Sequence, residues 1–378
     1  MKIAQLKYSR EANWQPISTE IENPDLILVF GSTPLIKEQI PVQQLKNKYP
    51  NAIFFGGTSA GEICGTNVFD DTIIATCVRF EHTKVKYFNE AIQSADESFE
   101  VGKKLIEKMQ ASNLQHVLIM SEGLHVNGSE LVKGIRSVLQ SNVSATGGLA
   151  GDGANFSETF VLDENGNAQN KMVSAIGLYR ERLTVSYGSL GGWDSFGVER
   201  LVTKSVSNVL YELDGKPALD LYKSFLGEHA KDLPASGLLF PLNLRTEKSS
   251  EPVVRTILAV DEEKQTLTFA GDIPEGSYVR LMKANFDRLI EGAIGAAKGT
   301  LKTEQNENPE LAILISCVGR KLVLKQMIEE EVEGVKDVLG PHTALCGFYS
   351  YGEISPFSNE TKCELHNQTM TITTLSEK

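Results

Sequence analysis

Short apolar runs separated by segments of helical period characterise the chain. Residues 26–30, 117–120 and 311–317 are almost entirely apolar over strand-sized lengths, as in strands buried on both faces. The segments that follow them space their apolar residues like amphipathic helices. None of the apolar runs approaches the ~20 residues that a membrane-spanning helix needs. The pattern predicts a mixed α/β protein.

One order of elements recurs three times: strand, helix, strand, glycine-rich turn, strand. The copies occupy residues 25–80, 84–180 and 276–375, and the second and third begin with an extra strand and helix. In the first and third copies the string Ser-x-Gly-Glu-Ile falls at the same place, at 59–63 and 350–354. The middle copy lacks this string, and a chance pattern is the alternative there. We infer internal duplication and predict that the two serines end equivalent strands.

A region of different character, about 183–275, separates the second and third copies. It contains a helix–turn–helix pattern at 205–227 and a hairpin at 253–271. This change of character places a domain boundary near residue 182. Each copy supplies helices for only one face of a sheet, so the other face needs a cover, and a second sheet is the simplest one. We therefore predict sheets packed face to face, in two layers, with helices outside.

Charge and cysteine content limit the classes of function. The chain has 37 Lys and Arg against 49 Asp and Glu, a net charge of −12 without a basic stripe, which argues against nucleic-acid binding. Its five cysteines are an odd number without a C-x-x-C pair, as expected for buried, reduced thiols and not for disulfides or a structural zinc site. The N-terminus has no apolar signal core. We therefore expect a cytoplasmic protein without membrane insertion.

The segment 57–61 matches G-x-S-x-G, the nucleophile elbow of serine hydrolases. An elbow leads into a helix whose amides help to form the oxyanion hole. Here Glu62 opens a segment that ends in two aspartates and is a poor helix start. The serine also recurs as Ser350, which fits a structural or ligand-facing turn better than a unique nucleophile. A serine hydrolase at Ser59 is kept as an alternative.

Acidic residues follow these turns in all three copies. Glu62 and Glu353 each come after a glycine near the end of a predicted core strand, and Asp152 stands near the same point of the middle copy. Two such carboxylates could act as acid and base, or they could accept hydrogen bonds from turn amides. Tyr349 and Tyr351 alternate with the serine between them, so strand geometry places both on the face opposite to it.

A small anionic or zwitterionic ligand needs a local cation and free amides in an acidic protein. Arg320 could hold a carboxylate bidentately, although a solvated arginine at a strand end is the alternative. The first copy has Ser32-Thr33 at the place that we assign to Gly319-Arg320. We therefore predict the main pocket in the third copy and no catalytic residue. The predicted ligand-binding residues are Arg320, Ser350, Tyr351, Gly352, Glu353, Ser59, Gly61, Glu62 and Asp152.

Six segments together resemble the motifs of FIST proteins, which carry FIST N and FIST C sensory domains. They are GGTSAGEICG, TGGLAGDG, LYELDGKPALDLY, FAGDIPEGSYVRLM, CGFYSYGEISPF and CELHNQTMTITTL. The resemblance covers nearly the whole chain and implies a FIST N-like domain at 1–220, with two copies of the block. It also implies a FIST C-like domain at 221–378, with the hairpin region and the third copy.

The resemblance implies a non-enzymatic module that senses a small ligand such as an amino acid. Family members are linked to histidine kinases, cyclic-di-GMP enzymes and chemotaxis receptors, so the output here would pass to such a partner. One bacterial branch of similar length binds haem b and senses nitric oxide, which is the alternative function. A haem pocket needs an axial ligand on a rigid element. His366, in a predicted strand, and His125, in a glycine-flanked segment, are the candidates.

Overall fold

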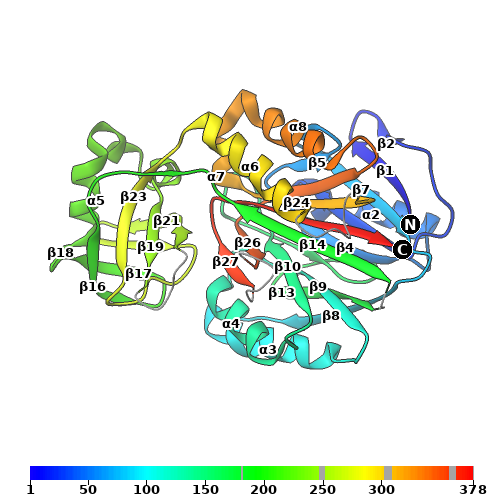
Figure 1. Cartoon of the computed structure of the whole chain (residues 1–378), viewed down its shortest axis with the longest axis horizontal. Helices are drawn as coiled ribbons and strands as arrows, with labels where there is room; N and C mark the ends of the chain where they lie inside the picture. The colour runs from blue at the N-terminus through cyan, green and yellow to red at the C-terminus, as the bar shows by residue number, and fades with distance from the viewer. Residues whose placement is uncertain (180–181, 247–251, 302–308, 357–362, 378) are drawn as a thin grey trace.

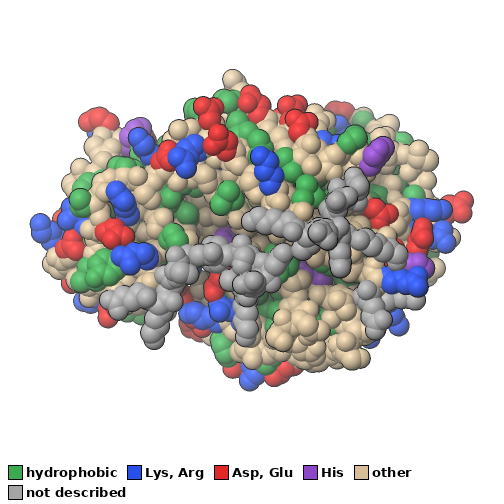
Figure 2. Space-filling view, viewed as in Figure 1, with side chains coloured by type: hydrophobic (Ala, Val, Ile, Leu, Met, Phe, Trp, Pro, Cys, Tyr) green, Lys and Arg blue, Asp and Glu red, His purple; other side chains and the backbone are tan. Residues whose placement is uncertain are grey.

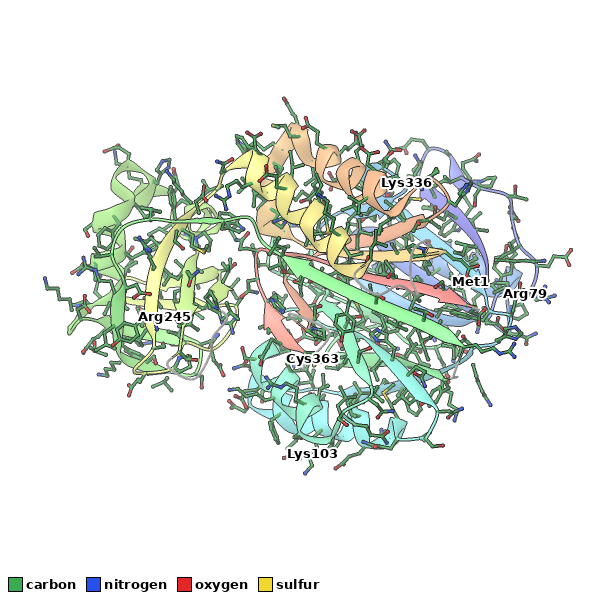
Figure 3. All side chains as sticks on the ribbon, in the orientation of Figure 1. Met1, Arg79, Lys103, Arg245, Lys336 and Cys363 are labelled. Carbon is green, nitrogen blue, oxygen red and sulfur yellow. The ribbon has the colours of Figure 1, made fainter. Side chains whose placement is uncertain are left out.

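The computed structural model describes residues 1–179, 182–246, 252–301, 309–356 and 363–377. Helices and strands alternate in it, which confirms the predicted mixed α/β class. Three sheets of six or seven strands form the larger part of the molecule, and a fourth sheet lies at one end (Figure 1). Met1 lies at the opposite end (Figure 3), where its amino group is 2.6 Å from a carboxylate oxygen of Glu310.

Each of the three sheets is built around one copy of the repeated block. Two central strands run parallel because a helical segment connects them, and the last strand of the copy pairs antiparallel with the first central strand. A further strand, which comes before these three in sequence, pairs with the last strand. In this order the strands are β3 (Leu26–Gly31), β4 (Ile53–Thr58), β7 (Ile73–Arg79) and β1 (Lys2–Ser9) in the first sheet, β9 (Leu114–Ser121), β10 (Ser144–Leu149), β13 (Met172–Tyr179) and β8 (Lys84–Ala91) in the second, and β24 (Leu311–Cys317), β25 (Ala344–Ser350), β28 (Met370–Glu377) and β14 (Leu183–Leu190) in the third.

A glycine at the same point of each copy confirms that all three are equivalent. Gly56, Gly147 and Gly347 lie in the second central strand, directly beside the first. A Cβ atom on any of them would lie about 2 Å from a carbonyl oxygen of that neighbour, at 1.9, 2.1 and 1.8 Å respectively. Only glycine permits such an approach. The middle copy is therefore a true repeat and not a chance pattern.

The three copies exchange hairpins in a closed ring. The hairpin of each copy pairs with the second central strand of another copy: that of the first copy with β25, that of the third with β10, and that of the second with β4. The hairpins are β5 (Glu62–Cys64) with β6 (Asn67–Phe69), β26 (Gly352–Ser355) with β27 (Glu364–His366), and β11 (Val161–Leu162) with β12 (Ala168–Gln169). The copies thus form a pseudo-threefold assembly within one chain.

The central core lies where the three sheets face one another. Leu28, Leu118 and Ile313 occupy equivalent positions of the first central strands, and all three are buried there. The helices cover the outer faces, as predicted, although three sheets surround this core where we expected two layers. These helices are α1 (Thr33–Glu38) and α2 (Ile40–Lys48), α3 (Ser98–Met109) and α4 (Gly128–Val138), and α6 (Phe286–Thr300), α7 (Val318–Leu324) and α8 (Ile328–Leu339).

Residues 191–284, which we call the insertion, interrupt the third copy. We expected the strand 276–282 to precede α6 in the repeat, and this was wrong: β23 (Tyr278–Lys283) belongs to the fourth sheet, and β14 takes its place. The register shows why, because β14 pairs with the whole length of β28. The insertion has its own hydrophobic core, between this sheet and α5 (Ala218–Leu226).

The strands of the insertion form a nine-stranded antiparallel arrangement at the left of Figure 1. The predicted hairpin is confirmed, with Asp261 opposite Thr266 across its turn. The strands are β15 (Asp194–Ser195), β16 (Arg200–Val206), β17 (Val209–Leu213), β18 (Lys216–Pro217), β19 (Leu242–Arg245), β20 (Val253–Arg255), β21 (Ile257–Asp261), β22 (Thr266–Phe269) and β23. Among the described residues, no helix is long and apolar enough to cross a membrane. All five cysteines lie in the described part of the chain, where each is buried, as predicted, and forms no disulfide bond.

Candidate functional site

The first and third copies carry the same buried triad of serine, glutamate and threonine. Ser59 Oγ lies 2.5 Å from Glu62 Oε1, and Thr72 Oγ1 lies 2.7 Å from Glu62 Oε2. The third copy repeats this arrangement, with Ser350 Oγ 2.7 Å from Glu353 Oε1 and a threonine hydroxyl 2.9 Å from its Oε2. Both serines follow or end the second central strand, so the predicted equivalence is confirmed.

Burial dominates the electrostatics of both triads. Burial raises the pKa of Glu62 to about 8, and the hydrogen bonds from Ser59 and Thr72 counteract only part of this effect. Burial likewise raises the pKa of Glu353 to about 8, against the hydrogen bonds from Ser350 and from the backbone and side chain of Thr369. Both carboxyl groups are therefore largely protonated at neutral pH. A protonated carboxyl group can donate as well as accept a hydrogen bond.

The G-x-S-x-G segment is not a nucleophile elbow. The chain leaves Ser59 into strand β5, so no helix N-terminus follows the serine. The Ser59 side chain is buried, and its hydroxyl is engaged by a carboxyl group of its own turn. Gly61 has a φ of 137° and faces Lys321 so closely that an added Cβ would lie 2.3 Å from its Nζ. The glycine therefore serves packing between copies.

Lys321, from α7 of the third copy, closes the turn of the first copy. Its Nζ donates to the carbonyl oxygen of Ala60 at 2.9 Å and pairs with Asp70. The sequence analysis did not identify this lysine, because α7 and the turn are about 260 residues apart. The first turn is thus tied to a neighbouring copy by a side chain that lies near the surface.

A second turn of the third copy, residues 367–369 between β27 and β28, is buried and carries polar groups that lack hydrogen-bond partners in the described structure. Asn367 is completely buried, and within the described parts of the chain neither its Oδ1 nor its Nδ2 has a hydrogen-bond partner. Gln368, also buried, has a φ of 63° and an unpartnered Oε1. Thr369 completes the turn through its bonds to Glu353. A Cβ on Gly352 would lie 3.6 Å from Asn367 Nδ2, so the two turns are in contact.

The insertion covers this buried turn. Gln368 Nε2 donates to the carbonyl oxygen of Leu238 at 3.2 Å, within the short 3-10 helix η3 (Ala235–Leu239). Trp193 Nε1 donates to the carbonyl oxygen of Gln368 at 2.9 Å. On the same side, Arg255 Nη1 of the insertion donates to the carbonyl oxygen of Leu365 in β27, two residues after Cys363, which Figure 3 labels. The sequence analysis missed Asn367 and Gln368, although a run of four polar residues before an apolar strand was the available signal.

Arg320 does not face a pocket in this structure. Its Nη2 donates to Glu331 Oε2 and to the carbonyl oxygen of Leu289, both at 2.7 Å, and its Nη1 donates to that of Gly191. The ion pair is completely buried. The guanidinium therefore ties α7 to α8, α6 and the start of the insertion. The strand register also shows that Leu35, and not Thr33, is its counterpart in the first copy.

The two tyrosines beside Ser350 diverge, because strand β25 ends there. Tyr349 Oη donates to Glu331 Oε1 at 2.9 Å, on the helix-covered face. Tyr351 reaches the middle copy, where its hydroxyl donates to Asp152. Burial opposes ionisation of Asp152, but the bonds from Tyr351 and from three loop amides hold its pKa below the ordinary value. Asp152 thus organises the loop after β10, and its serine partner is Ser157, which follows it in this loop, whereas the serines of the two glutamates precede them.

Neither histidine candidate has the geometry of a haem ligand. His366 Nε2 lies 2.8 Å from the carbonyl oxygen of Ser355, and the ring is buried between strands. Burial lowers the pKa of His366 to about 4. His125 lies on a half-exposed loop with its Nδ1 3.1 Å from a carboxylate oxygen of Glu122. Neither ring lines the cavities discussed below. The residues present do not fit haem at these positions.

Comparisons with known proteins agree with the motifs. A model of the FIST N domain matches residues 25–216, and a model of the FIST C domain matches residues 218–356. An uncharacterized protein of Methanocaldococcus jannaschii is 28% identical over 204 residues, which are 50% of this chain and 38% of that protein, so the chain matches well under half of this relative. The crystal structure of cyanuric acid hydrolase from A. caulinodans covers 94% of this chain and 90% of its own, at 6% identity and a TM-score of 0.33, too low to carry an argument. Because the two domain models together span most of the chain, the protein belongs to the FIST family.

Proposed function

We propose that the protein is a non-catalytic sensor whose small ligand binds at the buried turn of the third copy. The observation that carries the proposal is Asn367, a fully buried amide without a partner in the described structure. Buried polar atoms are nearly always hydrogen-bonded, and an unsatisfied one costs about 1–3 kcal/mol. A ligand that pairs with this amide recovers that free energy. FIST domains are associated with sensing, which agrees with this role.

The groups at the turn favour a compact, polar and uncharged ligand. Asn367 offers the two N–H donors of its NH2 group and a carbonyl oxygen, Gln368 offers its Oε1, and Glu353 offers a mostly protonated carboxyl group. Arg320 is already neutralised by Glu331, so it provides no free cation for an anionic ligand. This replaces the anionic ligand expected from the sequence. Ser350 and Gly352 stay in the proposed site, and Ser59, Gly61 and Glu62 would form its weaker counterpart.

The insertion would carry the signal. Its residues Trp193 and Leu238 close the turn through their bonds to Gln368. A ligand that reaches Asn367 must loosen these contacts, so its occupancy would shift the position of the insertion relative to the three copies. We propose that this shift is read by a separate signalling protein, such as a histidine kinase or a cyclic-di-GMP enzyme.

The surroundings of both serines favour a role in binding over a role in catalysis. Ser59 and Ser350 are buried, and the hydroxyl of each is engaged by a protonated carboxyl group of its own turn. A neutral carboxyl group is a poor base for activating a hydroxyl nucleophile. The paired arrangement instead fixes the shape of two turns.

Native mass spectrometry of the purified full chain tests the proposal, followed by a thermal-shift screen with uncharged polar compounds. The variant Asn367→Leu keeps the volume but removes both polar atoms, and because it also removes an unsatisfied buried group it should fold. Asn170→Leu is the matched control, since Asn170 is exposed at the equivalent position of the middle copy. The wild type and the control should show the ligand mass or a stabilising shift that Asn367→Leu lacks. Equal binding by Asn367→Leu, or no binding by the wild type, would contradict the proposal.

A further inference from the structure

We propose a second, independent ligand site in the insertion: an apolar pocket that takes a neutral aromatic ring or an equally compact apolar group. The pocket has a volume of about 150 Å³ and opens to solvent. Apart from Arg200, its walls are apolar or aromatic residues and one glycine. None of the residues of the buried turn takes part in it.

The pocket lies between α5 and the sheet of the insertion. Leu213 from β17, Leu242 from β19 and Leu281 from β23 form its floor, and all three are buried in the core of the insertion. Phe225 from α5 and Val198 stand at the mouth, where they are 41% and 64% exposed. Apolar side chains accordingly reach the surface of the insertion (Figure 2, left). Small-molecule sites are typically concave and mostly apolar, as this cavity is.

Arg200 determines the charge of the ligand. Its guanidinium carbon lies 5.5 Å from the centre of the Phe225 ring, and its Nη1 lies 3.0 Å from Asp214 Oδ2. The positive charge is therefore neutralised beside the pocket, and within the described residues the guanidinium keeps one buried donor without a partner, Nε, which cannot bind both oxygens of a carboxylate. A charged ligand would lose most of its hydration for at most this one hydrogen bond, whereas a neutral ring would exchange water for apolar contacts.

The volume determines the size of the ligand. A dry apolar cavity of about 150 Å³ is known to hold a benzene molecule. A second cavity, at the centre of the three copies beside His116, has only about 10 Å³, which is room for one water molecule. We therefore expect the same aromatic probe to bind in the pocket of the insertion and not in the central cavity.

Methyl NMR of the full chain with fluorobenzene as the probe tests this site. Fluorobenzene should shift the methyl signals of Leu213, Leu242 and Leu281 saturably and leave that of Leu28, in the central cavity, unchanged. The charged analogue 4-fluorobenzoate should bind at least about tenfold more weakly. No saturable shift up to the solubility limit, equal binding of the benzoate, or shifts confined to other methyl groups would overturn the proposal.

The variant Leu281→Phe tests the pocket by filling it. It should weaken fluorobenzene binding at least about tenfold. Leu258→Phe, the same substitution on a partly exposed strand residue outside the pocket, should bind like the wild type. Unchanged binding by a folded Leu281→Phe would contradict the assignment. If this variant does not fold, the changes in the methyl signals of the wild type test the assignment of the pocket by themselves. The outcome is independent of Asn367, so failure here leaves the proposed sensor site standing, and the reverse also holds.

Discussion

Replacing Glu353 by glutamine should make the stability of the protein less sensitive to rising pH. The pKa of Glu353 rises from its ordinary value of 4.5 to about 8 on burial. A group whose pKa is higher in the folded state stabilises the fold at low pH, and this contribution is lost as the pH rises through the folded-state pKa. At 1.36 kcal/mol per pKa unit, the shift corresponds to about 5 kcal/mol, lost between pH 4.5 and 8. Glutamine has nearly the shape of the protonated acid and cannot ionise.

Urea unfolding at pH 5, 6, 7 and 8 measures the effect. Wild type and Glu353→Gln should have similar free energies of unfolding at pH 5, where the carboxyl group is protonated in the folded state. The difference should then grow in favour of the variant by about 1.4 kcal/mol per pH unit, reaching about 4 kcal/mol at pH 8. Glu62→Gln should behave in the same way.

Glu228→Gln is the control, because the Glu228 side chain is 89% exposed. This substitution should leave the pH dependence of the free energy of unfolding unchanged. A difference between Glu353→Gln and the wild type that stays flat from pH 5 to 8 would refute the reasoning, because it would mean that Glu353 is ionised throughout. The infrared band of the protonated carboxyl group offers a second readout, since in the wild type it should fall to about half of its low-pH intensity near pH 8, and it should be weaker in the variant at pH 6.

Three further changes test the packing within the third copy and between it and the middle copy, each by urea unfolding. Gly347→Ala should destabilise by at least about 2 kcal/mol, because its Cβ would lie 1.8 Å from the Leu314 carbonyl oxygen. Tyr351→Phe should cost about 1.5–3 kcal/mol by removing the hydroxyl bonded to Asp152, and a loss below 0.5 kcal/mol would contradict this role. Arg320→Met should cost about 3–5 kcal/mol, since it leaves a buried carboxylate unpaired.

The repeat could be predicted from the sequence because its signals are local. Apolar runs define the strands, and the string at 59–63 recurs at 350–354 at the same point of the block. The structure confirms both, down to the contacts between each serine and its glutamate. The poor helix start after Ser59 was also a local signal, and it correctly argued against a nucleophile elbow.

The errors arise from contacts between distant segments. β14 and α6 belong to one copy, but 95 residues separate them, so the nearer strand at 278–283 looked like the partner of α6. Arg320 looked like a free cation because Glu331 and Gly191 approach it only in the folded chain. No periodicity within a segment contains this information.

The ring of exchanged hairpins connects the buried glutamates to the assembly of the three copies. Glu62 opens β5, which pairs with β25 of the third copy, and Glu353 lies in β26, which pairs with β10 of the second. Each protonated carboxyl group therefore stands where one copy joins another. Ionisation at either place adds a buried charge to a junction, so it should weaken the pairing of that hairpin first. Because Glu353 also borders the turn that the insertion covers, ligand binding at Asn367 and opening of this junction act on the same contacts, and the two should be coupled.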